Sequence, residues 1–172
     1  MFRLKESSIG LLLVILSFSI VGVSAFVYES AQQSITQTVQ EIATITLQNS
    51  ALGNIEEGAT QAYTKSEVAE LGNAISLTTT KANVYLHLDS DLNDLTDYST
   101  YTITVKFSQV VGSTYSIGDT ACTMTLASPD PTAIDLDAAG TWKFDFEITT
   151  TAGLVDADVP TTVTITVTAE ST

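Results

Sequence analysis

Apolar residues alternate with polar ones, above all with threonine, through most of the chain after residue 43. In residues 98–107, for example, an apolar side chain recurs at every second position from Tyr101 to Phe107. The same period of two recurs in residues 43–48, 60–65, 74–79, 84–88, 121–126, 140–149 and 161–168. Successive side chains of a strand point to opposite faces, so each segment is predicted to be a half-buried antiparallel strand. The 28 threonines fit this prediction, because a β-branched residue suits the exposed face of a strand.

Turn-forming residues separate these segments, as at Gly72-Asn73 and Ala139-Gly140. Seven or eight short strands with turns between them predict an Ig-like antiparallel β-sandwich over residues 43–172. After Ile42 we expect no helix beyond a turn near residues 66–71. The last strand is expected to pair in a sheet, and an open strand edge can accept an extended segment from a neighbouring molecule. The inward rows supply an expected core led by Trp142, Phe144, Phe146, Tyr101 and Phe107.

The amino-terminal part of the chain has a different character. Residues 9–28 carry no charge, and as a helix they would span about 30 Å, the thickness of the hydrocarbon core of a bilayer. Arg3 and Lys5 precede this apolar stretch, which favours a cytoplasmic start and export of the remainder. The precursor is therefore expected to be inserted in a membrane.

Two interpretations of this stretch stay open. Val23-Ser24-Ala25 fits the small-residue pattern of a signal-peptidase site, so residues 1–25 can be a cleaved signal peptide. Alternatively the stretch is retained, because it is longer than a usual signal core and Ile35, Val39 and Ile42 continue it with helical spacing. We favour the second interpretation: a leader over residues 1–8, then a hydrophobic and amphipathic helix over residues 9–42. With the β-sandwich, this predicts an α+β fold class.

Composition excludes several functions. The formal net charge of −14 and the pI near 4.1 argue against nucleic acid as a partner, since binding phosphates needs Lys and Arg. Cys122 is the only cysteine and His87 the only histidine, so a cysteine zinc cluster and a multi-histidine metal site are excluded. Phosphate-binding glycine loops, G-x-S-x-G and H-E-x-x-H motifs are absent from the sequence, and we expect no enzymatic activity.

One acidic cluster resembles a cation site. Asp89, Asp91 and Asn93 place oxygen ligands at alternate positions, like the opening of a calcium loop, and Asp94 follows them. The pattern then departs from such a loop, because Asp94 stands where glycine is needed and Thr100 where glutamate is needed. Calcium at these four residues is a candidate cofactor, and a solvated loop between strands is the simpler interpretation.

The lone histidine and the lone cysteine have simpler interpretations as well. His87 falls on the polar side of its predicted strand, so it is expected at the surface or at a sheet edge. Cys122 shares an inward row with Met124 and Leu126, so a buried structural thiol is expected.

A short charged leader, an apolar stretch and a threonine-rich β-domain together resemble archaeal type IV pilins and the related archaellins. Ser8-Ile9-Gly10 resembles the mature start of archaellins, and Ala31-Gln32-Gln33 falls where such helices become polar. The family has a basic pair followed by Gly or Ala at its cleavage point, and this chain has Lys5-Glu6-Ser7-Ser8 there. The resemblance implies helices bundled in a filament core with β-domains outside. Other archaeal surface pili resemble the alternative, cleavage after Ala25 and strand donation between sandwiches, with residues 35–47 as the donor.

These patterns predict a structural subunit of an extracellular, pilus-like filament on the cell surface, with a role in adhesion or surface interaction. Its partner would be further copies of itself. The alternative is a secreted or membrane-anchored β-sandwich module that binds calcium or a carbohydrate. The residues expected to drive polymerisation are the apolar ones of the amino-terminal segment: Leu11, Leu12, Leu13, Val14, Ile15, Leu16, Phe18, Ile20, Val21, Val23, Phe26, Val27, Ile35, Val39 and Ile42.

Overall fold

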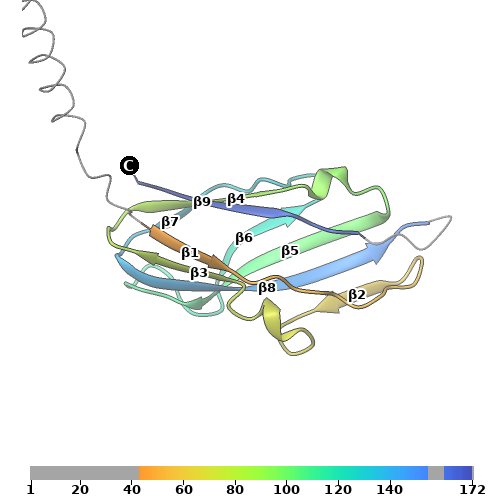
Figure 1. Ribbon diagram of the computed structural model, residues 1–172, viewed down its shortest axis with the longest axis horizontal. Helices are drawn as coiled ribbons and strands as arrows, with labels where there is room; N and C mark the ends of the chain where they lie inside the picture. The colour runs from red at the N-terminus through yellow and green to blue at the C-terminus, as the bar shows by residue number, and fades with distance from the viewer. Residues whose placement is uncertain (1–42, 155–160, 172) are drawn as a thin grey trace, which may run out of the picture. The chain divides into compact units, whose positions relative to one another are not determined.

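The computed structural model describes residues 43–154 and 161–171. Nine strands and two single-turn 3₁₀ helices, η1 and η2, lie within these residues (Figure 1). The elements are β1 (Ala43–Leu47), β2 (Thr60–Tyr63), η1 (Ala69–Leu71), β3 (Ile75–Thr79), β4 (Val84–Ser90), η2 (Leu92–Asp94), β5 (Tyr98–Gln109), β6 (Thr120–Thr125), β7 (Ile134–Leu136), β8 (Gly140–Ala152) and β9 (Ile165–Ser171).

The strands form two antiparallel sheets that face each other across a common core. The larger sheet has the order β1-β3-β8-β5-β6, and β2 extends it by pairing with the far half of β8. The smaller sheet has the order β7-β4-β9. Because β1 and β9 each pair with a single strand, both are edge strands within the described part of the chain.

The apolar residues that alternate with polar ones in the sequence form the core. Along β8, Trp142 and Phe144 are fully buried while the residues between them reach the outer face. Phe107 of β5 lies against both rings, with centroids 6.0 Å from Trp142 and 5.1 Å from Phe144. The Trp142 indole N–H donates a hydrogen bond of 3.1 Å to the carbonyl oxygen of Ala138, which satisfies the one polar atom of this side chain.

The smaller sheet closes the other side of the core. Val84, Leu86 and Leu88 of β4 point inward and are almost completely buried. Ile134 and Leu136 of β7 continue this apolar surface. Two rows of apolar side chains therefore meet between the sheets, as in a β-sandwich.

The predicted α+β fold class is wrong for the part of the chain that the structure describes. Residues 43–154 and 161–171 are nearly all β, and their helical content is limited to η1 and η2. The helix predicted over residues 9–42 lies outside the described residues. Within the described ranges, no helix is long and apolar enough to cross a membrane.

The strand predictions hold with local corrections. All eight predicted segments contain a strand, and the turn near residues 66–71 contains η1. The ninth strand, β7, was not predicted because three residues are too few to show a period of two. The last strand was predicted to begin at Thr161, but β9 begins at Ile165. Its ladder stops there because the Thr164 N–H bonds the Asp91 carboxylate, at 2.8 Å, in place of a backbone carbonyl.

Candidate functional site: an apolar groove between two strand edges

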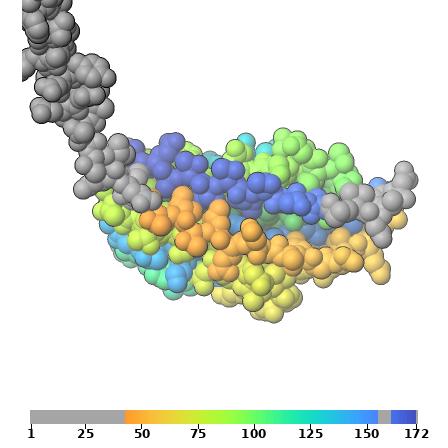
Figure 2. Space-filling view, viewed as in Figure 1, coloured from red at the N-terminus to blue at the C-terminus, as the bar shows by residue number. Residues whose placement is uncertain are grey.

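A groove of about 920 Å³ runs between the two sheets on the side where their edge strands face each other. One wall consists of Leu47, the last residue of β1, and of the segment that follows it as far as Glu57; the other consists of residues 161–163, Ile165 and Val167. In Figure 2 the blue band of β9 runs beside the orange band that contains β1 and the residues after it. The groove therefore opens the interior of the sandwich along one side.

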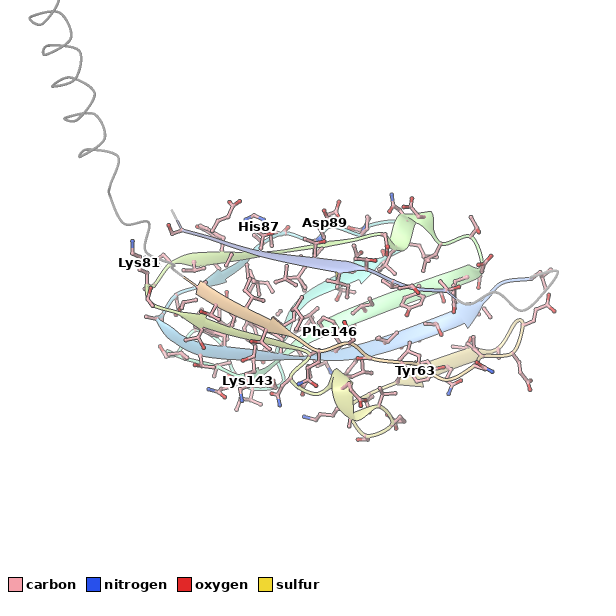
Figure 3. The ribbon with its side chains drawn as sticks, viewed as in Figure 1. Tyr63, Lys81, His87, Asp89, Lys143 and Phe146 are labelled. Atoms are coloured by element: carbon pink, nitrogen blue, oxygen red, sulfur yellow. The ribbon has the colours of Figure 1, made fainter. Side chains whose placement is uncertain are left out.

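The floor of the groove is the inner face of the larger sheet. Ile103, Phe146 and Ile148 line it, together with Ile75 and Tyr101. Phe146 keeps 8% of its surface exposed and Ile148 keeps 6%, whereas Trp142 and Phe144 on the same strand keep none. Figure 3 shows Phe146 pointing into the interior between the sheets. The core is thus less well covered at the groove than at the opposite end of β8.

The inward row of β9 is only half-buried. Ile165, Val167 and Ala169 point into the core, and each is of intermediate exposure. On the other edge, Ala43 and Ile45 of β1 are also half-buried and Leu47 is 47% exposed. Each of the two edges therefore presents a short aliphatic row that its own fold covers incompletely.

The direction of the free backbone groups on β9 follows from its pairing. Asp91 and Thr164 lie opposite each other, and the Asp91 N–H donates to the Thr164 carbonyl oxygen at 3.3 Å. Backbone groups of a strand alternate in direction, so those of Thr166 and Thr168 also point toward β4. Those of Ile165, Val167 and Ala169 therefore point to the open edge.

The same reasoning applies to β1. The Gln48 N–H donates to the Ala74 carbonyl oxygen at 3.0 Å, one position beyond the last pair of the ladder with β3. By alternation, the backbone groups of Ala43, Ile45 and Leu47 point away from β3. On both edges, the residues with outward backbone groups are those whose side chains face the interior.

Two tyrosines, Tyr98 and Tyr101, line one end of the groove, and Tyr63 contacts its wall at Gly53. The rings of Tyr98 and Tyr101 meet edge to face with centroids 5.1 Å apart, and the Tyr63 hydroxyl donates to the carbonyl oxygen of Gly53 at 3.3 Å. Burial, with a smaller effect of Tyr98, raises the pKa of Tyr101 to about 12. The Tyr101 hydroxyl is therefore protonated at neutral pH.

The four residues of the predicted calcium site lie around the end of β4. Asp89 is exposed on the strand, Asp91 is half-buried after it, and Asn93 and Asp94 are exposed in η2. Asp91 accepts a hydrogen bond from the Thr164 N–H at 2.8 Å, so it joins the end of β4 to the segment before β9. Within residues 43–154 and 161–171, no three His, Cys, Asp or Glu side chains are arranged to hold a metal ion. Calcium binding stays a prediction.

Asp89 has a different neighbour from the one the sequence suggested. It shares a shallow hollow of about 330 Å³ on the outer face of the smaller sheet with Asp130 and His87. A hydrogen bond between the carboxyl groups of Asp89 and Asp130 raises the pKa of Asp89, and the negative charge of Asp130 raises it further. Figure 3 shows His87 and Asp89 on the outer side of β4, away from the interior.

His87 and Cys122 lie where the sequence placed them. His87 is exposed, and its Nε2 atom is 3.6 Å from Oε2 of Glu170 on β9. Cys122 is buried, and this burial raises the pKa of its thiol to about 12. The expected surface histidine and buried thiol are both confirmed.

The residues predicted to drive polymerisation, from Leu11 to Ile42, all lie outside the described residues. Of the predicted donor segment 35–47, residues 43–47 are described, and they form β1 in the sheet of their own chain. This part of the segment is therefore already paired, which leaves residues 35–42 as the remaining candidate donor.

Sequence reasoning missed the groove itself. The sequence carries no usable signal for it. The inward residues of the edge strand β9 are aliphatic, and so are those of β3 and β4, which pair on both sides. No known family model matches the chain, and no curated protein is significantly similar to it in sequence.

Proposed function

We propose that this protein is a structural subunit of an extracellular, pilus-like filament, and that it polymerises through the residues that precede β1. The observation that carries the proposal is the groove, which leaves apolar interior surface accessible between two strand edges. Apolar side chains left partly accessible beside two strand edges mark a candidate site of protein association. The residues directly before β1, which both expected mature starts keep, include the apolar Ile35, Val39 and Ile42 and supply a complementary segment in every copy.

Self-association would remove this apolar surface from water. At about 25 cal/mol per Å², burying a row of three aliphatic side chains with the groove floor stabilises a contact by several kcal/mol before the entropy of association is subtracted. A filament repeats such a contact at every subunit. In this role the protein needs no catalytic group, no cofactor and no nucleic acid.

The acidic character of the chain fits an exterior position. A formal charge of −14 per subunit keeps assembled filaments apart and in solution. Threonine-rich strand faces such as those of β5 and β9 would then form the outer, hydroxyl-bearing surface that meets other surfaces. The precursor would be held in a membrane by residues 9–28 before assembly.

Two measurements on native material test the proposal. The intact mass of the mature protein identifies its first residue, which we expect near Ser8 or at Phe26, and both starts keep residues 35–42. Electron microscopy of the cell surface and of concentrated purified protein is expected to show filaments. A mature protein that stays monomeric at high concentration, and forms no filament on cells, would refute the proposal.

A further inference from the structure

We propose that the open edge of β9 is the assembly site, and that it receives residues 35–42 of a second copy as an added strand. This inference rests on the proposed function and specifies its contact. The receiving surface is the β9 edge together with the groove beneath it, residues 161–169.

Among the two edges, β9 is the one whose added strand would fill the groove. Residues 161–163, Ile165 and Val167 line the groove, whereas β1 contributes only Leu47. β9 is also longer, with seven residues against five, so it offers more backbone groups to a partner. An added strand would turn the three-stranded sheet into a four-stranded one and cover the half-buried row of Ile165, Val167 and Ala169.

A buried polar atom next to this edge is consistent with a missing partner. The hydroxyl oxygen of Thr161 is buried at the groove wall, and it has no hydrogen-bond partner among the described residues. A buried hydroxyl without a partner is unfavourable. The backbone of an added strand would bring donors and acceptors into this part of the groove.

The chemistry of residues 35–42 suits the role of the added strand. Five of these eight residues are β-branched (Ile35, Thr36, Thr38, Val39 and Ile42), and none is Gly or Pro. Eight residues in extended conformation span about 26 Å, which matches the roughly 23 Å of the seven-residue β9. Glu41 is the one charged residue of the segment, and residues 30–40 carry no charge, so two strongly acidic copies would meet through a segment of low charge.

The direction of β1 favours a donor from another copy over the chain's own segment. Ala43 pairs with Thr79, and only four residues separate Thr79 from Val84, which pairs with Ser171 at the end of β9. The chain thus enters β1 at the end of the domain where β9 finishes. To lie along its own β9, the segment would need to reverse direction directly before Ala43, and Gln40, Glu41 and Ile42 are not turn-forming residues.

A pair of proline variants separates the two edges. The Val167 N–H points to the open edge of β9, so Val167→Pro keeps the ladder with β4 and removes a donor that the added strand needs. Ile45→Pro does the same on β1 and is the matched control. We expect Val167→Pro to lower the amount of filament at least about tenfold, the effect of about 1.4 kcal/mol per contact, while Ile45→Pro assembles like the unmodified chain. Circular dichroism and the melting temperature report whether each variant folds.

Disulfide cross-linking identifies the occupant independently of the proline variants. In a Cys122→Ala background, one population of full-length chains carries Thr166→Cys, and a second carries a single cysteine at one of positions 35–42. The outward side chains of neighbouring strands lie close enough to form a disulfide. We expect covalent dimers only when the two populations are mixed before assembly, and only at every second donor position.

The outcomes are distinguishable. If the unmodified chain forms no filaments, the proposed function fails. If filaments form and Val167→Pro also forms them, or only Ile45→Pro prevents them, the β9 edge is not the assembly site. If Val167→Pro does not fold, the cross-links decide. Dimers formed by the Thr166→Cys population alone would show that two β9 strands pair with each other, which would overturn the inference. Cross-links at every third or fourth donor position would indicate a helical donor and would overturn it as well. The absence of any cross-linked dimer within formed filaments would also overturn it.

Discussion

At the residue scale, Gly140 is the position where the backbone most needs glycine. Its φ of 143° lies in the region that other residues rarely adopt, and an added Cβ would come within 2.9 Å of a methyl carbon of Val111. We expect Gly140→Ala to lower the free energy of unfolding by about 1–3 kcal/mol, measured by urea denaturation. Gly53→Ala is the control, since no heavy atom lies within 4 Å of its added Cβ. Equal stability of the two variants would contradict this explanation.

The thiol of Cys122 gives a second prediction at the same scale. Because only the thiolate reacts with iodoacetamide, a buried thiol with a pKa of about 12 should be almost inert at pH 8. We expect the folded protein to be labelled at least about a hundredfold more slowly than the protein in guanidinium, as measured by mass spectrometry. Rapid labelling of the folded protein would mean that β6 opens readily at the edge of its sheet.

Single residues also show where sequence reasoning is limited. The spacing of Asp89, Asp91 and Asn93 suggested a shared ion, but a chain-local pattern cannot show that Asp91 bonds the backbone of Thr164, 73 positions away. The partner of Asp89 is Asp130, which the sequence places in a separate loop. Positions on a strand are predictable from the sequence, and partners across strands depend on the pairing of the sheet.

At the scale of elements, Asp145 connects β8 to the segment between β2 and β3. It accepts hydrogen bonds from the Lys65 ammonium at 2.8 Å and from the Asn73 N–H at 2.7 Å. Burial alone raises the pKa of Asp145, but these hydrogen bonds outweigh it and hold the pKa below the usual 3.8. A carboxyl group with a lowered pKa stabilises the fold above its unfolded pKa, and this contribution is lost as the pH falls through the folded pKa.

We therefore expect Asp145→Asn to destabilise the protein by about 1–2 kcal/mol at pH 7. This difference should disappear as the pH falls through the folded pKa of Asp145, which lies below 3.8. Asp89→Asn should act in the opposite direction. Its pKa is raised by Asp130, so its carboxyl group stabilises the fold only while protonated, and removing the charge should raise the melting temperature at pH 7. The melting temperatures of the unmodified protein and the two variants are measured between pH 3 and 8. If both variants change the melting temperature in the same direction at pH 7, the opposite pKa shifts of Asp145 and Asp89 are contradicted.

The strands were predictable because a strand that is buried on one face carries an apolar residue at every second position of the sequence. Trp142, Phe144 and Phe146 fell on the predicted inward side, and the inward row of β5 did as well. The strand order was not predictable, since it depends on contacts between distant segments such as β4 with β9. The groove follows from that order, because it exists only where two edge strands face each other. The α+β class was wrong for the described residues because it came from the amino-terminal segment alone.

At the scale of the whole molecule, charge and apolar surface act against each other. Each copy carries a formal charge of −14, and only six residues of the chain are basic. Two of the four lysines after the amino-terminal segment are held in ion pairs, Lys65 with Asp145 and Lys106 with Glu147, both at 2.8 Å. Copies that approach each other therefore repel until the apolar contact forms. Electrostatic repulsion should consequently limit the rate of association, while burial of apolar surface stabilises the contact once it has formed.

This balance predicts that salt accelerates assembly. Screening shortens the range of repulsion from about 20 Å at 20 mM salt to about 7 Å at 200 mM, so we expect filament formation to speed up several-fold over this interval, measured by light scattering. The double variant Glu56→Gln and Glu70→Gln removes two exposed negative charges, from −14 to −12, and should assemble faster at low salt with a weaker salt dependence. Val167→Pro should form at least about tenfold less filament than the unmodified chain at every salt concentration, because screening does not restore a missing strand contact. Assembly that slows with added salt would show instead that opposite charges hold the copies together, and the apolar groove would then not be the main source of their affinity.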